Sequence, residues 1–237
     1  MAVSSEPRRV VIFGATSGIA QAVAREYARR GARLVLVARA PERLAAVAAD
    51  LEVRGHRTLV DESIAALGGI DVALIAHGVL SDQAAAVADP LLSRATWEAN
   101  FVSAASLAER VAERMAEAKH GVLGLLSSVA GERGRADNYV YGASKAALTA
   151  YASGLGHRLR GTGVKVVTVK PGPVDTPMTA RRTIRSGLLA DVDVVGASIH
   201  QALERGERVV YVPRKWRWIM AVIRSLPLRL FERLKVR

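Results

Sequence analysis

Two residues spaced four apart, Tyr141 and Lys145, form the pair in this chain that is best suited to acid–base chemistry. In a helix, such residues lie one turn apart on the same face. A neighbouring ammonium favours the phenolate and lowers the pKa of a tyrosine from about 10 towards neutral pH. A phenol tuned in this way can donate or accept a proton during a reaction. Ser128, which lies thirteen residues before Tyr141, adds a hydroxyl that can orient a carbonyl group.

Because the four-residue spacing is common on helix surfaces, the elements around the pair decide what it means. Short apolar runs alternate with helical segments along most of the chain. The predicted strands are residues 10–13, 34–37, 72–75, 122–126, 165–169 and 209–212. The predicted helices are residues 18–30, 41–51, 96–118 and 141–160. This alternation predicts an α/β fold with a doubly wound parallel sheet and helices on both faces.

One stretch of the pattern is ambiguous. Between residues 55 and 69, the chain must supply a strand and a helix in little space. We expect a strand at residues 56–60 and a short helix after Asp61; the alternative places the strand at residues 46–50.

A glycine-rich turn, Gly14-Ala15-Thr16-Ser17-Gly18-Ile19-Ala20, joins the first predicted strand to the first helix. Backbone N–H groups at such a helix start, together with the helix dipole, bind phosphate groups. Gly14 permits a tight turn, and Gly18 lets the backbone approach a pyrophosphate. The spacing is G-x-x-x-G-x-A and no lysine follows, which argues against a P-loop nucleotide triphosphatase. The turn therefore predicts a dinucleotide site.

The end of the second predicted strand indicates which dinucleotide binds. NAD binding favours a carboxylate there, to accept a hydrogen bond from the ribose 2′-hydroxyl, whereas this chain has Ala38 and Arg39. A guanidinium can bind a 2′-phosphate through two hydrogen bonds and stack on adenine. We therefore expect NADP(H), with NAD(H) still open, since Arg39 could instead be a solvated loop residue.

The glycine turn, Asn100, Ser128, Tyr141/Lys145 and the segment Pro171-Gly172-Pro173-Val174-Asp175-Thr176 resemble, in order and spacing, the short-chain dehydrogenases/reductases. The resemblance covers about residues 8–212 and implies a single Rossmann-type domain that transfers hydride between a nicotinamide cofactor and a carbonyl or alcohol. It implies that Ser128 orients the carbonyl and that Tyr141 exchanges the proton. Lys145 would hold the nicotinamide ribose and lower the pKa of the tyrosine, and Asn100 would support a water in the proton relay. Ser127 is the competing serine, but the thirteen-residue spacing favours Ser128.

The same resemblance implies a set of cofactor contacts. They are Gly14, Thr16, Ser17, Gly18, Ile19, Arg39, Asp61, Ala76, Gly78, Asn100, Tyr141, Lys145, Pro171, Gly172, Val174 and Thr176. Asp50 is the alternative to Asp61 beside the adenine. One motif departs from the family pattern, because Ile75-Ala76-His77-Gly78 stands where the family has Asn-Asn-Ala-Gly. The change removes side-chain amides that brace the centre of the sheet, which bears on stability more than on chemistry.

Composition limits the other function classes. The chain has 237 residues, of which half are hydrophobic and none is cysteine, so disulfides and thiolate chemistry are absent. Its five histidines lack metal-ligand spacing, and we expect no metal site. No G-x-S-x-G motif occurs, which argues against a serine hydrolase. The polar N-terminus predicts no signal peptide and a cytoplasmic protein, with a flexible segment at residues 1–8 before a domain at 9–213.

The net charge of +12 is concentrated in a C-terminal segment, residues 214–237, which has eight basic residues against one acid. Its apolar residues, tryptophans included, alternate with the cations, as in helices that lie at a membrane surface. We expect either peripheral contact with the inner face of a membrane, or an apolar face that packs against a neighbouring subunit or covers the substrate pocket. Nucleic-acid binding is not expected, because the basic residues are not spread over a folded face.

A narrower likeness concerns the substrate. Ala76-His77-Gly78-Val79-Leu80, Ser127-Ser128-Val129-Ala130-Gly131-Glu132-Arg133 and the Trp/Arg-rich C-terminus resemble reductases that act on a decaprenylphosphoryl 2-keto-pentose. The expected substrate is thus a small or lipid-linked carbonyl compound, and the family implies a homodimer or homotetramer. The alternative from another class is a non-catalytic dinucleotide-binding sensor or a membrane-surface adaptor.

Overall fold

The described part of the protein, residues 6–38, 60–180 and 187–233 of a computed structural model, contains one sheet of parallel strands. The strands are β1 (Arg9–Phe13), β2 (Arg33–Val37), β3 (Val72–Ile75), β4 (Gly121–Leu126), β5 (Val164–Pro171) and β6 (Val209–Val212). Each of them confirms one of the six predicted runs, with small shifts at the ends. Their order across the sheet is β2-β1-β3-β4-β5-β6. The chain leaves β1 towards β2 on one side and returns to β3 on the other, so the carboxyl ends of β1 and β3 flank the switch point where α/β sheets bind ligands.

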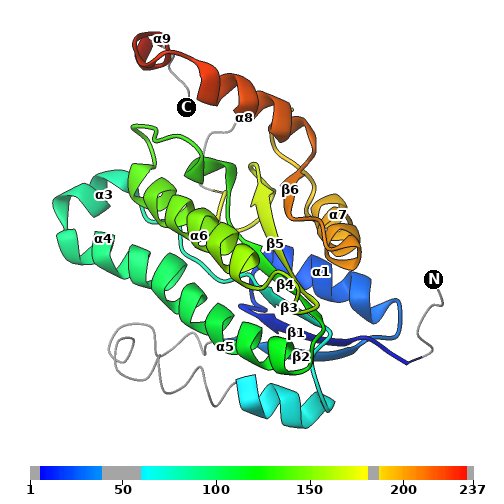
Figure 1. The fold of residues 1–237 in the computed structure, drawn as a ribbon. Coiled ribbons are helices and arrows are strands. Elements are labelled where there is room, and N and C mark those ends of the chain that lie inside the picture. The colour runs from blue at the N-terminus through cyan, green and yellow to red at the C-terminus, as the bar shows by residue number, and fades with distance from the viewer. Residues whose placement is uncertain (1–5, 39–59, 181–186, 234–237) are drawn as a thin grey trace.

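Helices cover both faces of the sheet (Figure 1). In chain order they are α1 (Gly18–Ala28), residues 60–67, α3 (Gln83–Ala88), α4 (Pro90–Trp97), α5 (Ser103–Glu117), α6 (Tyr139–Arg158), α7 (Val192–Arg205), α8 (Lys215–Ser225) and α9 (Leu228–Arg233). A π-helical turn (Glu98–Val102) links α4 to α5, and a short 3₁₀ helix (Val129–Gly131) follows β4. The helix predicted at 96–118 is thus observed as α4, the π turn and α5 in succession, and it begins earlier, at Pro90. There the Asp89 carboxylate accepts a hydrogen bond from the Leu91 N–H at 2.9 Å.

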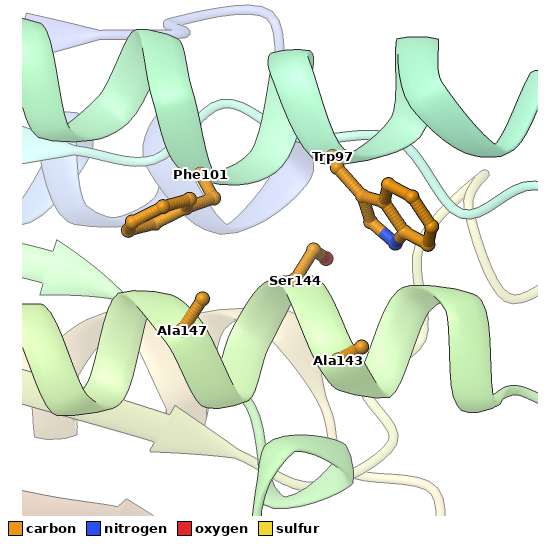
Figure 2. A pocket seen from close by; sticks show the side chains of 5 residues that line it. All are labelled: Trp97, Phe101, Ala143, Ser144 and Ala147. Carbon is orange, nitrogen blue, oxygen red and sulfur yellow. The ribbon is translucent and has the colours of Figure 1, made fainter. Parts of the chain in front are cut away.

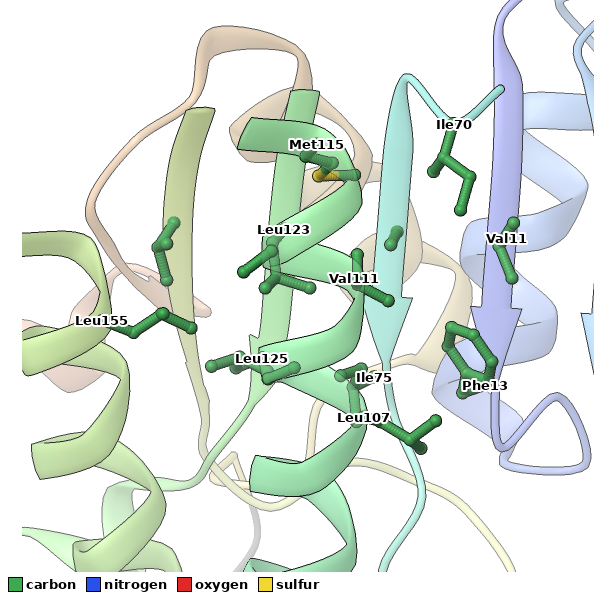
Figure 3. Close-up of a cluster of buried hydrophobic side chains, with 14 of the residues drawn as sticks. Val11, Phe13, Ile70, Ile75, Leu107, Val111, Met115, Leu123, Leu125 and Leu155 are labelled. Carbon is green, nitrogen blue, oxygen red and sulfur yellow. The ribbon is translucent and has the colours of Figure 1, made fainter. Parts of the chain in front are cut away.

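Successive residues of each central strand point into opposite cores, as their near-continuous apolar sequences require. Val11 and Phe13 of β1 belong to a core beneath α5, α6 and residues 60–67, part of which is shown in Figure 3. Val10 and Ile12 belong to the second core, beneath α1 and α7. Both faces of the sheet are thus buried, and the carboxyl ends of the strands are left to build a site.

Several predictions made from the sequence concern residues outside the described ranges. These are Arg39, Asp50, the helix at 41–51 and the alternative strand at 46–50, together with residues 56–59 of the preferred strand. Val60, the last residue of that predicted strand, is instead helical, as are the described residues 61–67 that follow it.

Candidate active site

Helix α6 places Tyr141 and Lys145 one turn apart, with the Lys145 Nζ 5.9 Å from the centroid of the Tyr141 ring. Lys145 is 3% exposed, and its ammonium donates a hydrogen bond to the Leu126 carbonyl at the end of β4, at 2.8 Å. Burial lowers the pKa of Lys145 from 10.5 to about 8, because a charged amine loses hydration there. A desolvated cation beside a phenol interacts with the phenolate more strongly than a hydrated one.

Asn100 lies in the π-helical turn, is fully buried, and makes three side-chain hydrogen bonds to two residues. Its Oδ1 accepts a hydrogen bond from the Val79 N–H at 2.7 Å, and its Nδ2 donates to the Val79 carbonyl at 2.9 Å and to the Ser144 Oγ at 3.0 Å. A Cβ added at Gly78 would lie 3.0 Å from the Asn100 Oδ1 and 3.3 Å from the Lys145 Nζ. The segment after β3 therefore meets Asn100 and Lys145 at one point. Single π turns are frequent at functional sites, and no residue pattern in this segment predicted one.

The two adjacent serines have different surroundings. Ser127 is 2% exposed; its hydroxyl donates to the Lys145 carbonyl at 2.9 Å and contacts the Thr149 hydroxyl at 2.6 Å. Ser128 lies at the start of the 3₁₀ helix, where its Oγ accepts from the Ala130 N–H at 3.1 Å and lies 3.5 Å from the Pro171 carbonyl. Ser127 thus joins β4 to α6, whereas the Ser128 hydroxyl, held only by longer bonds, faces the Pro-Gly segment.

The glycine turn after β1 is tight and is bonded through its backbone to the end of β2. Gly14 has φ +81°, and the N–H groups of Gly14 and Ala15 both donate to the Val37 carbonyl at the end of β2, at 2.8 and 3.0 Å. A Cβ at Gly14 would lie 2.5 Å from the His77 backbone nitrogen, so no larger residue fits there. Ser17 caps α1, which leaves the N-terminal N–H groups of the helix facing the turn.

The remaining predicted cofactor residues lie around the same edge of the sheet. Ala76 follows β3, and its N–H donates to the Phe13 carbonyl at 2.9 Å. Thr176 comes close to the glycine turn, since a Cβ at Gly18 would lie 3.1 Å from the Thr176 Cγ2. Val174 is buried and pairs with Ala190. The segments that follow β1, β3 and β5 are thereby brought together.

His77 replaces part of the bracing that the family asparagines supply. Its Nε2 lies 2.8 Å from the Ser103 Oγ at the start of α5, and the Ser103 hydroxyl also donates to the Ala99 carbonyl at 3.0 Å. The imidazole therefore ties the segment after β3 to α5, the role expected of the missing side-chain amides.

Asp61 lies in the helix at 60–67, where its carboxylate binds the guanidinium groups of two α5 residues, Arg110 at 2.9 Å and Arg114 at 3.0 Å. Hydrogen bonding by Arg110, together with Arg114, holds the pKa of Asp61 below its usual value. The sequence did not indicate these ion pairs. An adenine contact, which stays a prediction, would have to share this carboxylate with them.

The C-terminal segment packs beside Ser128. Trp216 and Met220 of α8 are buried against Val129, the residue that follows Ser128. The Arg133 guanidinium donates to the carbonyls of Ile223, Arg224 and Leu226 at 2.6, 3.3 and 2.7 Å and lies 4.0 Å from the Phe231 ring centroid. One arginine therefore closes the end of α8 and fixes α8 and α9 to the loop that carries Ser128.

A buried polar group supports the same loop. Glu132 accepts hydrogen bonds from the Lys170 ammonium at 2.6 Å and from the Tyr211 hydroxyl at 2.5 Å. Burial, with Glu132 adding to it, raises the pKa of Tyr211 to about 12. Sequence reasoning missed Lys170 and Tyr211; the position of Lys170 directly before Pro171 was the one available signal.

Comparisons with known proteins agree with this arrangement. A family model described as short chain dehydrogenase matches residues 8–186. An uncharacterized oxidoreductase of Streptomyces coelicolor is 37% identical over 98% of this chain and 98% of its own length. Another, from Mycobacterium tuberculosis, is 38% identical over 95% of this chain and 96% of its own. The crystal structure of a short chain dehydrogenase from Burkholderia cenocepacia in complex with NADP has a TM-score of 0.81, at 21% identity, over 98% of this chain and 99% of that chain.

The chain therefore belongs to the short-chain dehydrogenase/reductase family. It is an NAD(P)-dependent oxidoreductase with the Rossmann fold of that family.

Proposed function

We propose that this protein is an NADPH-dependent carbonyl reductase, or an alcohol dehydrogenase in the reverse direction, with Tyr141 as its general acid and base. The observation that carries the proposal is the shared face of α6, on which the buried Lys145 ammonium lies beside the Tyr141 ring. Ser128 and Asn100 come from two other elements and approach the same edge of the sheet.

The proposed reaction is a hydride transfer coupled to a proton transfer. When bound, the nicotinamide supplies the hydride that a carbonyl carbon accepts. Tyr141 gives its phenolic proton to the carbonyl oxygen, and the Ser128 hydroxyl donates a hydrogen bond to the same oxygen as negative charge develops on it. Lys145 stabilises the phenolate that remains. Asn100, fixed by Val79, orients the water through which the proton is replaced.

The residues present fit a dinucleotide. The tight turn at Gly14 leads into α1, whose first N–H groups are the donors proposed for a pyrophosphate, beside the switch point of the sheet. We propose NADP(H) over NAD(H), because Ala38 and Arg39 provide no carboxylate at the end of β2. The solved Burkholderia relative was crystallised with NADP. Dissociation constants for NADPH and NADH test the preference, which Arg39→Ala should reduce; equal affinities in the wild-type protein would contradict it.

We propose a hydrophobic, lipid-linked carbonyl compound as the substrate class, presented at a membrane surface to α8 and α9. The outer side of these helices exposes Trp218, Val222, Leu228 and Leu230 to 71%, 60%, 64% and 50%. The basic residues of the C-terminal segment lie among them and suit anionic headgroups. In the described residues, no helix has both the length and the apolarity needed to cross a bilayer.

Vesicles test the surface contact. The double substitution Trp218→Ser with Leu228→Ser should weaken co-sedimentation with vesicles containing phosphatidylglycerol and leave NADPH binding intact, because both side chains point away from the body of the protein. Equal sedimentation of the variant and the wild type would refute the contact.

We also propose a homo-oligomer formed through α4–α6. An apolar hollow of about 280 Å³ lies between Trp97 and Phe101 on one side and Ala143 and Ala147 of α6 on the other (Figure 2). The hollow opens on the side of α6 opposite Tyr141. Ala143 and Ala147 follow Tyr141 by two and six residues, which rotates them about 200–240° from it around the helix. Trp97 is 44% exposed, which suits contact with a second copy. Sedimentation equilibrium of Trp97→Glu tests this; an unchanged mass would oppose the interface.

The reaction itself is tested by Tyr141→Phe. Oxidation of NADPH should be followed against a panel of carbonyl compounds that includes lipid-linked keto-sugars. The wild-type protein should turn over at least one of them, and the variant should lose turnover by orders of magnitude while binding NADPH equally well. A non-catalytic sensor predicts no turnover by either protein, and full activity of the variant would exclude Tyr141 as the proton donor.

A further inference from the structure

Trp216 is the inward-facing tryptophan of α8. It follows β6 by a few residues, at the end of the molecule where α8 and α9 lie beyond β5 and β6 (Figure 1). Its side chain is 5% exposed and packs with Val129 and Met220. Trp218, two residues on, points outwards and is 71% exposed.

The indole of Trp216 lies directly on Gly172. A Cβ added at Gly172 would lie 1.9 Å from the indole Nε1, so the ring occupies the space of a side chain at that position. Besides its predicted cofactor contact, Gly172 leaves room for an aromatic ring from the C-terminal segment, because it has no side chain.

Trp216 borders both segments that flank Ser128. The Ser128 Oγ lies 3.5 Å from the carbonyl of Pro171, the neighbour of Gly172. Val129, on the other side, packs on the tryptophan. An oxygen atom bound by the Ser128 hydroxyl would therefore lie close to this indole.

The indole N–H is buried and has no hydrogen-bond partner among the described residues. A buried N–H of tryptophan usually has an acceptor, because burial without one leaves its lost hydration uncompensated. Two nearby carbonyls already accept other hydrogen bonds. The Pro171 carbonyl faces the Ser128 hydroxyl, and the Val212 carbonyl accepts from the Gly172 N–H at 2.9 Å. An acceptor that arrives with a bound reactant would satisfy the indole N–H once the indole shifts enough to admit that atom.

Resting on the proposed function, we propose that Trp216 is a substrate-positioning residue of this enzyme. Its ring forms a wall of the carbonyl site beside Ser128, and its N–H donates a hydrogen bond to an acceptor oxygen of the reactants. That oxygen belongs either to the carbonyl substrate or to the carboxamide of the nicotinamide. The ring also limits the width of the site on this side, so Trp216 helps to determine specificity.

Trp216→Phe removes the N–H and keeps an aromatic wall, and Trp218→Phe is the matched control on the exposed side of the same helix. Three quantities are measured: kcat/KM for the best carbonyl of the panel, the affinity for NADP⁺, and the affinity for 2′-phospho-ADP-ribose, which lacks the nicotinamide. Loss of one hydrogen bond predicts a decrease of about 3- to 10-fold for Trp216→Phe. Trp218→Phe should equal the wild type in its affinities for NADP⁺ and 2′-phospho-ADP-ribose.

The affected quantity identifies the acceptor. A decrease in kcat/KM with unchanged NADP⁺ affinity assigns the oxygen to the substrate. Weaker NADP⁺ binding with unchanged 2′-phospho-ADP-ribose binding assigns it to the carboxamide. If Trp216→Phe equals the wild type in all three quantities, the inference is wrong. A wild-type protein that turns over no carbonyl would instead refute the proposed function.

A second measurement needs no substitution in the protein under test. With ¹⁵N-labelled indoles, the Trp216 N–H resonance should shift downfield when NADP⁺ and a carbonyl substrate are added. The chain has three tryptophans, so Trp97→Phe and Trp218→Phe assign the Trp216 resonance by elimination. An unmoved Trp216 resonance at saturating concentrations of both ligands would overturn the inference even if Trp216→Phe folds poorly.

Discussion

Replacing Lys145 with Met should stabilise the cofactor-free protein at neutral pH although it destroys the proposed site. Burial lowers the pKa of this lysine from 10.5 to about 8. Below pH 8, Lys145 is charged in both the folded and the unfolded chain. At ~1.4 kcal/mol per pKa unit, its lowered pKa then corresponds to a destabilisation of the folded state by about 3 kcal/mol. Met retains the apolar stem of the side chain and removes that charge.

The pH dependence isolates this effect. Between pH 8 and 10.5 the folded protein releases the Lys145 proton while the unfolded chain keeps it, so the unfolded state binds more protons and the wild-type protein gains stability as pH rises. Relative to Lys145→Met, the gain should reach about 2 kcal/mol by pH 9.5. The variant lacks the hydrogen bond to the Leu126 carbonyl at every pH, whereas the lysine can donate it as an ammonium or as a neutral amine. Its loss therefore shifts the two curves by a nearly constant amount.

The assay is urea-induced unfolding of the cofactor-free wild type and variant at pH 7 and pH 9.5, analysed for the free energy of unfolding. Lys165→Met removes an ammonium from an exposed position of β5 and serves as the control. Equal differences between the wild type and Lys145→Met at both pH values would refute the buried-charge argument.

Three further predictions concern the site and its support. Gly172→Ala should displace Trp216 and lower the free energy of unfolding by about 1–3 kcal/mol, as overpacking does; an unchanged melting temperature and near-UV circular dichroism spectrum would contradict the contact. Arg133→Met should destabilise α8 and α9 by about 2 kcal/mol, because one charged donor holds three carbonyls, and hydrogen exchange in these helices should accelerate while exchange in α5 does not. Ser127→Ala should lower stability by about 1–3 kcal/mol, whereas Ser128→Ala should lower kcat and leave the melting temperature nearly unchanged; the reverse pattern would exchange their roles.

The strands and the Tyr141/Lys145 helix could be predicted because their signals are local. Buried parallel strands are short, continuous apolar runs, and Val10-Val11-Ile12-Phe13 is such a run between charged residues and a glycine. The glycine turn and the four-residue spacing likewise lie within single segments, so their positions follow once the strand order is known.

Features that depend on contacts between distant segments could not be predicted. The π turn at Asn100 inserts one residue into a helix whose sequence is otherwise regular, and bonds to Val79 and Ser144 hold it. The alternation of the C-terminal segment indicated a basic amphipathic segment, but not that Trp216 would face Gly172. That orientation depends on the empty space above a glycine some forty residues earlier.

A crystal structure of the NADP⁺ complex would show whether Tyr141 and Lys145 meet the nicotinamide. We expect the nicotinamide ribose within hydrogen-bond distance of the Lys145 Nζ and the Tyr141 hydroxyl, with the nicotinamide C4 open to a carbonyl held by Ser128. A dinucleotide bound away from α6, or a Tyr141 ring turned to solvent in that complex, would contradict this expectation.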